Sequence, residues 1–206
     1  MQELQITAVI PQEKGRALLK FDNGEEVLLY KGEIRKLSLR EGNLVSQDLY
    51  DKIIYEIVGT RAKKRALYLL ERMERTERQL YDKLKQNHYP EICIEEAVEY
   101  VKKYHYIDDL RYAQTYIRYH QNKKSRKRLQ LDLMTKGVAK NIIEQALENE
   151  FSSDEQEKIR QLLEKRHYDS SCDGKERQKT YQFLMRRGYK SSDIVHVMKI
   201  QGNYVE

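Results

Sequence analysis

The stretch RQLYDKLKQNHY, residues 78–89, is the first of three related segments in this 206-residue chain. The second is KRLQLDLMTKGV at residues 127–138, and the third is QKTYQFLMRRGY at residues 178–189. Leu84, Leu133 and Leu184 occupy equivalent places in them, 49 and then 51 residues apart. Self-similarity at a period of about 20–50 residues is typical of repeat architectures. The chain is therefore predicted to contain three copies of one unit.

Each of these segments lies between two other stretches with helical periodicity. The same two apolar positions follow every copy: Ile94 and Val98, then Ile143 and Leu147, then Ile194 and Met198. An apolar-periodic stretch also precedes every copy, at Ala66/Leu69/Leu70, Ala113/Tyr116/Ile117 and Ile159/Leu162/Leu163. Apolar residues spaced three and four apart form one face of a helix. Three helices per repeat are therefore predicted.

Capping residues help to place the ends of these helices. Thr76 and Ser152 each stand three residues before Gln or Glu, which is the pattern of a capping box. Gly137 and Gly188 fall where a helix end requires a residue with positive φ. The first copy has His88 at that place, which predicts a weaker cap.

The N-terminal part has a different pattern. Strands are predicted at residues 4–10, 16–21 and 25–30, and the Asn23-Gly24 pair suits a tight hairpin turn between the last two. A short helix is predicted at 33–37 and a longer one at 48–58, capped by Asp48 and ended by Gly59.

The predicted fold class is mainly α. Three tandem three-helix repeats would form an elongated, curved array, preceded by a small β-hairpin-containing N-terminal segment. The predicted boundaries are 1–59 for the N-terminal segment and 60–106, 107–151 and 152–206 for the repeats. Charged residues make up 35% of the chain and hydrophobic ones 39%, a balance that suits extended helical layers better than one deep core.

The sequence carries no signature of catalysis, and no metal or cofactor is expected. It lacks a GxxxxGK[ST] loop, its five histidines never pair four residues apart within a helix, and its two cysteines have no ligand-like spacing. Only a triad assembled in space stays open. The absence of a signal peptide and of a long apolar run, together with few cysteines, predicts a cytoplasmic protein without a membrane partner.

The positive charge is unevenly placed. Residues 1–60 contain 8 Lys/Arg and 10 Asp/Glu, whereas residues 61–206 contain 31 and 23. No acidic residue occurs from Leu110 to Leu131, although this run contains seven Lys/Arg. One-signed charge of this length favours contact with a polyanion or an acidic partner. The candidate contact residues are Arg118, Lys123, Lys124, Arg126, Lys127, Arg128, Arg186 and Arg187.

The alternative for this basic run is a solvated joint between two helices. Tyr112, Tyr116 and Tyr119 lie on one face of the helix before it, so they are expected to face the core, with stacking on a nucleic-acid base as the less favoured interpretation. Smaller basic clusters in the other repeats suggest a basic strip along the array. The alternative function is a free-standing nucleic-acid-binding helical repeat module without a protein partner.

Several of these segments resemble the RecX family of regulatory proteins. Residues 66–84, ALYLLERMERTERQLYDKL, resemble the opening repeat of that family. Residues 106–113, YIDDLRYA, are similar to its most recognisable segment, and Lys136-Gly137-Val138 and residues 183–189, FLMRRGY, match later repeat ends. The resemblance covers about residues 60–200, with a looser match before it. His88 and His105 depart from the family pattern at places where Gly often stands.

The resemblance implies a non-enzymatic bacterial modulator of the RecA recombinase. Such proteins bind the RecA–single-stranded-DNA filament and typically limit its ATPase, strand-exchange and co-protease activities in DNA repair and the SOS response. Partners would be the filament and single- or double-stranded DNA, and the expected oligomeric state is a monomer. The sequence leaves open whether this chain inhibits or stimulates, which basic cluster contacts DNA or protein, and what the N-terminal segment contributes.

Overall fold

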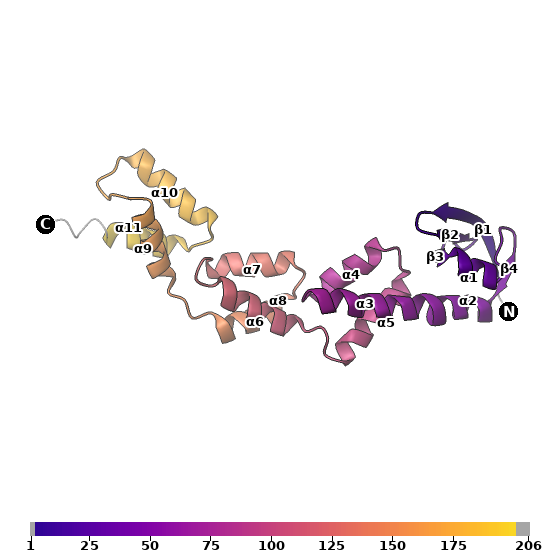
Figure 1. Cartoon of the computed structure of the whole chain (residues 1–206). Helices are drawn as coiled ribbons and strands as arrows, with labels where there is room; N and C mark the ends of the chain where they lie inside the picture. The colour runs from indigo at the N-terminus through magenta and orange to yellow at the C-terminus, as the bar shows by residue number, and fades with distance from the viewer. Residues whose placement is uncertain (1–2, 201–206) are drawn as a thin grey trace. The chain divides into compact units, whose positions relative to one another are not determined.

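The computed structural model describes residues 3–200, which form two compact units that divide after Asp108 (Figure 1). The first unit holds the N-terminal segment and the first repeat, and the second unit holds the other two repeats. Residues 1–2 and 201–206, which the predicted boundaries include, lie outside the described residues. Within residues 3–200, no helix is long and apolar enough to cross a membrane.

An antiparallel sheet opens the first unit. Its strands are β1 (Glu3–Gln12), β2 (Arg16–Phe21), β3 (Glu26–Tyr30) and β4 (Leu44–Ser46), in the order β3-β2-β1-β4. The predicted hairpin is confirmed: Gly24 has φ +85°, and the Asn23 side chain accepts a hydrogen bond from the Glu25 amide at 3.0 Å. The short helix is also confirmed, as α1 (Lys31–Lys36). Strand β4 was not predicted, because three residues are too few to show alternation.

One unbroken helical segment connects the sheet to the first repeat. It consists of α2 (Gln47–Asp51), the π-helical stretch η1 (Lys52–Gly59) and α3 (Thr60–Arg72). The prediction that Gly59 ends a helix is wrong: Gly59 has the helical angles φ −61° and ψ −45°. A Cβ there would lie 3.2 Å from the Ile54 carbonyl oxygen, so glycine allows close packing rather than a turn. The cap is Ser46 rather than Asp48, because the Ser46 hydroxyl accepts a hydrogen bond from the Leu49 amide at 3.3 Å.

The predicted plan of three helices per repeat is confirmed. In each repeat the third helix packs against both of the others. The first repeat consists of α3, α4 (Glu77–Gln86) and α5 (Glu91–Lys103). The second consists of α6 (Asp109–His120), α7 (Arg126–Thr135) and α8 (Lys140–Glu150). The third consists of α9 (Glu155–Lys165), α10 (Gly174–Arg186) and α11 (Ser191–Ile200).

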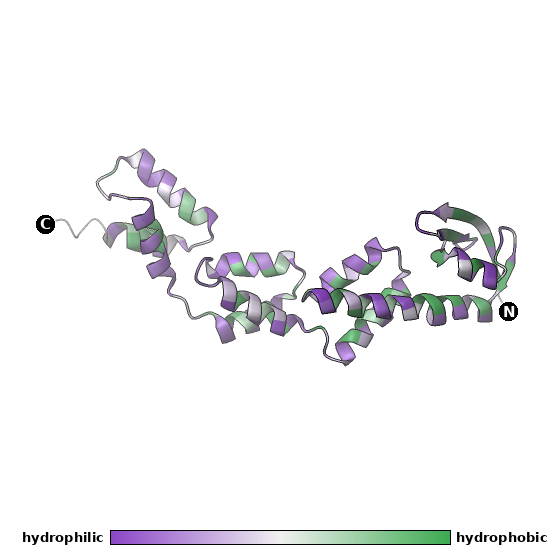
Figure 2. Ribbon diagram, in the orientation of Figure 1, coloured by the Kyte–Doolittle hydropathy of each residue, from purple (hydrophilic) through white to green (hydrophobic). Residues whose placement is uncertain are grey.

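The repeated apolar positions form the cores of the repeats. Leu84, Leu133 and Leu184 are each 0% exposed, and the equivalent isoleucines of the third helices are at most 1% exposed. The apolar residues lie on the helix faces that pack together, and the outer faces are polar (Figure 2). Periodicity therefore identified the buried face correctly in all three copies.

The buried residues form three separate clusters. The first cluster joins residues of the sheet, such as Leu29, to residues of the first repeat, such as Leu80 and Val101. The second and third repeats have a cluster each. The predicted boundary at residue 59 therefore does not separate two cores.

In the three repeats, five helix ends use a residue with positive φ. Gly137 and Gly188 have φ of +86° and +83°, as predicted, and His88, His105 and His167 have φ between +52° and +59°. The two histidines that depart from the family pattern thus form the same left-handed turn that glycine forms elsewhere. The capping box at Thr76 is confirmed. The cap predicted at Ser152 is wrong, because α9 starts two residues later with Asp154 as its N-cap.

Candidate polyanion-binding site

The predicted contact residues lie on three parts of the second unit. Arg118 is near the end of α6, and Lys123 and Lys124 lie in the joint between α6 and α7. The first turn of α7 contains Arg126, Lys127 and Arg128, and Arg186 and Arg187 lie at the end of α10 in the third repeat. The Ser125 hydroxyl starts α7 by accepting a hydrogen bond from the Arg128 amide at 3.1 Å.

Lys124 is held inside a polar cluster of the second repeat. Its Nζ atom lies 2.7 Å from Asp132 Oδ2 and 2.8 Å from the Tyr116 hydroxyl, which itself donates to Asp132 at 3.1 Å. Burial lowers the pKa of Lys124, but the hydrogen bonds with Asp132 and Tyr116 outweigh it, so the net direction is upward. For Asp132, burial raises the pKa and the Lys124 contact outweighs it, so the net direction is downward. Lys124 therefore stabilises the repeat.

Three further arginines also have partners within the unit. Arg118 forms two hydrogen bonds with the Glu150 carboxylate, at 2.7 and 3.1 Å. Arg126 donates to the Leu147 carbonyl at 3.4 Å, and Arg128 Nε lies 3.0 Å from Asp132 Oδ1. The acid-free run is therefore partly neutralised in space by Asp132 and Glu150, which lie outside it in the sequence.

Lys123, Lys127 and Arg186 are the three predicted residues whose side chains are exposed and, within the described residues, form no hydrogen bond or ion pair with the protein. The Arg187 guanidinium lies over the ring of Phe183, 3.6 Å from its centroid, and forms no ion pair within the described residues. These four residues leave positive charge available on the surface of the second unit.

A cavity of about 280 Å³ brings the two basic groups together. It is lined by residues from the α6–α7 joint and from the end of α10: Lys123, Lys124, Ser125, Arg128, Arg186, Arg187 and Tyr189. No acidic side chain lines it among the described residues. Five cationic side chains around one concave surface can contact several oxygens of a polyanion. Sequence reasoning identified these five cations and missed Ser125 and Tyr189, although Ser125 has the residue type and position of an N-cap.

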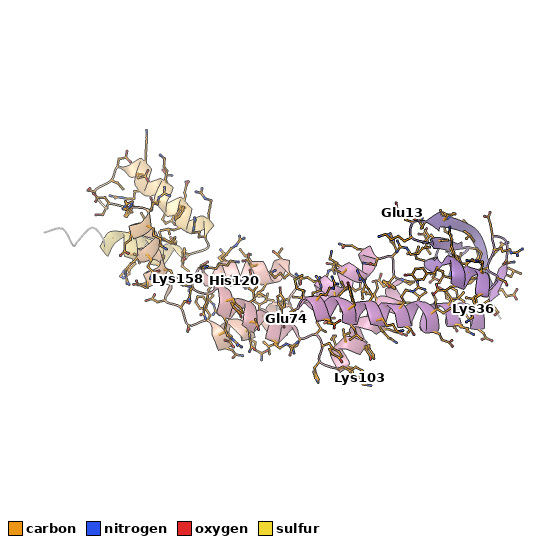
Figure 3. The ribbon with its side chains drawn as sticks, viewed as in Figure 1. Glu13, Lys36, Glu74, Lys103, His120 and Lys158 are labelled. Atoms are coloured by element: carbon orange, nitrogen blue, oxygen red, sulfur yellow. The ribbon has the colours of Figure 1, made fainter. Side chains whose placement is uncertain are left out.

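Polar contacts between the second and third repeats form this cavity. Ser125 Oγ donates to the Arg187 carbonyl at 2.7 Å, and Gly188 lies so close that a Cβ there would be 2.8 Å from Ser125 Oγ. Lys158, labelled in Figure 3, is 8% exposed and donates to the Lys124 carbonyl at 3.1 Å. Its Nζ atom lies 4.9 Å from the centroid of the Phe151 ring, and burial lowers its pKa.

The tyrosine stripe of α6 divides between core and solvent. Tyr112 and Tyr116 pack against the core of the second repeat, as expected. Tyr119 is 80% exposed, so the core interpretation is wrong for this residue. Tyr119 lies in the last turn of α6, two residues after the fully buried Ile117, and therefore on the opposite side of the helix from the core. An exposed aromatic beside basic residues is available for stacking on a base.

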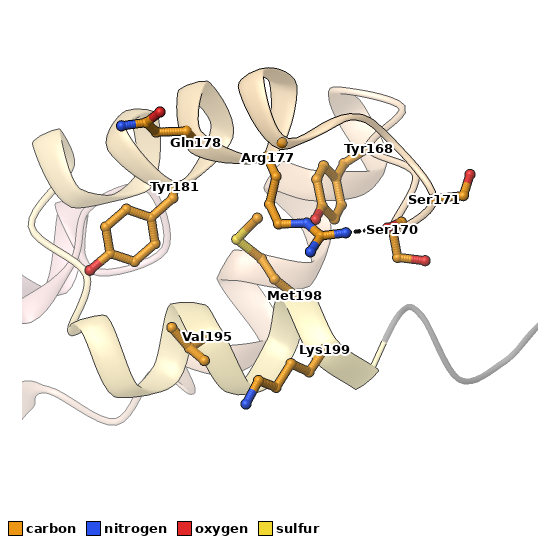
Figure 4. A pocket seen from close by; sticks show the side chains of 10 residues that line it. Tyr168, Ser170, Ser171, Arg177, Gln178, Tyr181, Val195, Met198 and Lys199 are labelled. Carbon is orange, nitrogen blue, oxygen red and sulfur yellow. Dashed lines mark hydrogen bonds between the residues drawn. The ribbon is translucent and has the colours of Figure 1, made fainter.

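Another cavity, of about 610 Å³, lies within the third repeat (Figure 4). It is lined by Tyr168, Tyr181, Val195 and Met198, and at its edge Arg177 donates to the Ser170 carbonyl at 2.9 Å.

No cluster of three His, Cys, Asp or Glu that could hold a metal ion occurs within residues 3–200. Burial raises the pKa of the Cys93 thiol to about 11, which makes it a poor nucleophile.

Comparison with known proteins gives a consistent picture. Models of the first, second and third three-helix domains of RecX match residues 62–100, 108–147 and 153–198. Regulatory protein RecX of Caldanaerobacter subterraneus subsp. tengcongensis is 32% identical, over 95% of this chain and 98% of that protein. Regulatory protein RecX of Clostridium acetobutylicum is 30% identical, over 97% of each.

Solved structures agree with the sequence comparison. A crystal structure of regulatory protein RecX covers 95% of this chain and 99% of its own, with a TM-score of 0.65 and 25% identity. A crystal structure of RecX from Lactobacillus salivarius covers 70% of this chain and 96% of its own, with a TM-score of 0.62 and 27% identity. The chain belongs to the RecX family of regulatory proteins.

Proposed function

We propose that this chain is a cytoplasmic, non-enzymatic regulator that acts as a monomer on the RecA recombinase. It binds the RecA–single-stranded-DNA filament and inhibits its ATPase, strand-exchange and co-protease activities. Family membership supports the regulatory role, since the relatives are named regulatory proteins. The chemistry of the second unit supports the mode of contact, because a basic concave surface suits a filament that contains DNA.

The observation that carries this proposal is the basic cavity between the second and third repeats. Lys123 and Arg186 line it, and Lys127 lies beside it near Gly188. Within the described residues these three exposed cations have no partner, so docking does not require an internal ion pair to break. By contrast, Arg118 and Lys124 would first have to leave Glu150 and Asp132. We therefore assign the primary contact to the three unpaired residues and a supporting role to Lys124, Arg126, Arg128 and Arg187.

Binding of this kind can regulate a filament without chemistry on the bound molecule. Repeats that each carry a contact gain affinity through multivalency when the contacts act together. A bound regulator then shifts the filament toward the nucleotide state or length that it binds best.

The test measures ATP hydrolysis and filament length with recombinase, single-stranded DNA and sub-stoichiometric amounts of this protein. The wild-type chain is expected to lower both. The triple variant Lys123→Glu, Lys127→Glu, Arg186→Glu is expected to lose this effect at least tenfold in effective concentration, because three attractive contacts become repulsive.

A matched control carries the same charge change elsewhere. Lys103, Lys165 and Lys175 are exposed, do not line the basic cavity and form no hydrogen bond or ion pair within the described residues. Changing all three to Glu should leave inhibition within about twofold. Equal loss in both variants would reduce the effect to net charge and contradict the assignment.

The alternative function is a free-standing nucleic-acid-binding module, which the same basic cavity would also serve. Inhibition that appears only when the protein saturates bare DNA would favour this alternative. The slope of log affinity for single-stranded DNA against log salt concentration should become shallower by about 0.7 for each phosphate contact that a substitution removes. Such a change in slope would identify DNA as the direct partner of these residues.

A further inference from the structure

A second cavity with arginines lies in the first unit, and none of the residues discussed above as contacts lines it. Its volume is about 270 Å³, and its lining residues come from the sheet, from the long helical segment and from the turn after α4. The charged or polar lining residues are Arg16, Arg61, Arg65, Asn87 and His88, accompanied by the phenols of Tyr30 and Tyr89. Among the described residues, no carboxylate lines this cavity.

Only one of the three arginines is neutralised. Arg61 Nη2 lies 2.6 Å from both carboxylate oxygens of Glu33, and Nη1 donates to the Leu28 carbonyl at 3.1 Å. The Glu33 carboxylate also accepts the Tyr30 amide at 2.8 Å. Arg61 therefore secures the sheet against α3 and sets the wall of the cavity.

Arg65 lies one turn further along α3, on the same helix face, and has no such partner. Its Nε atom is shielded from solvent and, within the described residues, has no hydrogen-bond partner, and its guanidinium lies over the Tyr68 ring, 5.1 Å from the centroid. Arg16 donates to a single carbonyl, that of Glu13, at 3.3 Å. A shielded guanidinium with unused donors costs folding free energy unless an anion accepts from it.

Tyr89 lines the same cavity as the three arginines. The pKa of Tyr89 is raised, by burial first, while the positive charges of Arg61, Arg65 and Arg16 act in the opposite direction. All three guanidinium groups therefore lie within electrostatic reach of one phenol. Since Arg61 is balanced by Glu33, the cavity keeps an uncompensated charge from Arg16 and Arg65.

We propose that this cavity binds the phosphate group of a nucleotide. The guanidinium groups of Arg16 and Arg65 and the phenols of Tyr30 and Tyr89 bring several hydrogen-bond donors to one place, which suits the several oxygens of a phosphate. Tyr30 is 46% exposed and lines the same cavity, which provides an aromatic surface for the attached base. The volume lies just below the range of about 300–1,000 Å³ typical of drug-sized ligands, so one nucleotide unit is the appropriate size.

The nucleotide has two possible sources, a free mononucleotide or the end of a single strand. Calorimetry on the full-length chain at low salt separates phosphate from base: thymidine 5′-monophosphate is expected to bind at least tenfold tighter than thymidine. Equal affinity for the two compounds, or no binding of the monophosphate, would overturn the proposal.

Variants then locate the site. Arg65→Ala should weaken binding of the monophosphate at least tenfold and Arg65→Lys by less, because lysine keeps the charge and loses the fork. Lys64→Ala removes the same charge from the neighbouring, exposed position and should change affinity less than twofold. If Arg65→Ala does not fold, Arg16→Ala serves the same purpose on the strand side. If the arginine variant that folds binds the monophosphate as tightly as Lys64→Ala does, this cavity is not the binding site.

The last arm identifies the source. A thymidine tetranucleotide with a 5′-phosphate is titrated into the Lys123→Glu, Lys127→Glu, Arg186→Glu chain, in which the other basic cavity is disabled. Binding at least tenfold tighter than the monophosphate assigns the site to a strand end, and equal binding assigns it to a free nucleotide.

Discussion

The first and second repeats have the same helix plan but join their neighbours in different ways. The first repeat shares a continuous apolar core with the sheet, and a helical segment without a break runs from one to the other. The second repeat has its own core and meets the third through hydrogen bonds of Ser125, Arg126 and Lys158. Apolar burial is non-directional and adds up over area, whereas each polar contact requires one geometry.

This difference predicts that the two junctions differ in local stability. A shared core is expected to unfold as one cooperative body. Two cores connected by a few polar contacts can open at lower free energy, since local stability follows buried apolar contact. The basic cavity thus lies at a junction held by polar contacts rather than by a shared apolar core, which suits the proposed contact with a filament.

The largest expected effect tests the shared core. Leu29→Ala removes a side chain that is 0% exposed in β3 and should lower the free energy of unfolding by about 3–4 kcal/mol. Hydrogen exchange should show loss of protection in the sheet and in α5 together. Leu133→Ala, also 0% exposed, should leave both unaffected because it belongs to the second repeat. If Leu29→Ala leaves the protection of α5 intact, the two parts do not share one cooperative core.

A smaller effect should appear at the polar junction. Gly188→Ala places a Cβ 2.8 Å from Ser125 Oγ and strains a backbone with φ +83°, so a loss of about 2–3 kcal/mol is expected by chemical denaturation. Gly24→Ala has the same backbone strain, with φ +85°, but no atom within 4 Å of the new Cβ, and should cost about 1 kcal/mol. If the two variants lose the same free energy of unfolding, the Ser125 side chain moves aside without a measurable loss of stability.

The smallest effect concerns the pH dependence of the junction. Burial lowers the pKa of Lys158 below its usual 10.5, so the unfolded chain binds this proton more tightly than the folded chain does. Stability should therefore rise with pH between the lowered pKa and 10.5, and the cost of burying the charge is fully present below that window. Relative to the Lys158→Met variant, the wild-type chain should become more stable as pH rises from 7 to 10.5, measured by urea midpoints. A difference that does not change with pH would show that Lys158 is not desolvated.

Local pattern accounted for most of the fold. The spacing of Leu84, Leu133 and Leu184 identified the repeats, since a helix that buries one face must place apolar residues at a fixed period. Capping was predicted less well: Thr76 and Gly188 were correct, whereas Gly59, Asp48 and Ser152 were not. A glycine or hydroxyl residue suits several positions, and the tertiary packing around it selects one.

The candidate site was predicted as a basic region but not as a geometry. The acid-free run indicated positive charge near Lys123–Arg128, and residues distant in sequence then decided which charges stay available. Asp132 and Glu150 hold Lys124 and Arg118, and neither contact is encoded by spacing along one helix. The cavity in the first unit was not predicted: Arg61 and Arg65 stood out only as part of a small basic cluster, and Arg16 is 49 residues from Arg65 in the sequence.

The sequence by itself determined the repeat number, the helical class, the buried leucines and the uneven charge of this protein. These properties depend on periodicity and composition, which each segment carries on its own. Only the tertiary structure decided that the sheet and the first repeat share one core, and which cations have partners. Electrostatic and packing energies depend on distances between side chains far apart in the chain, and those distances exist only after folding.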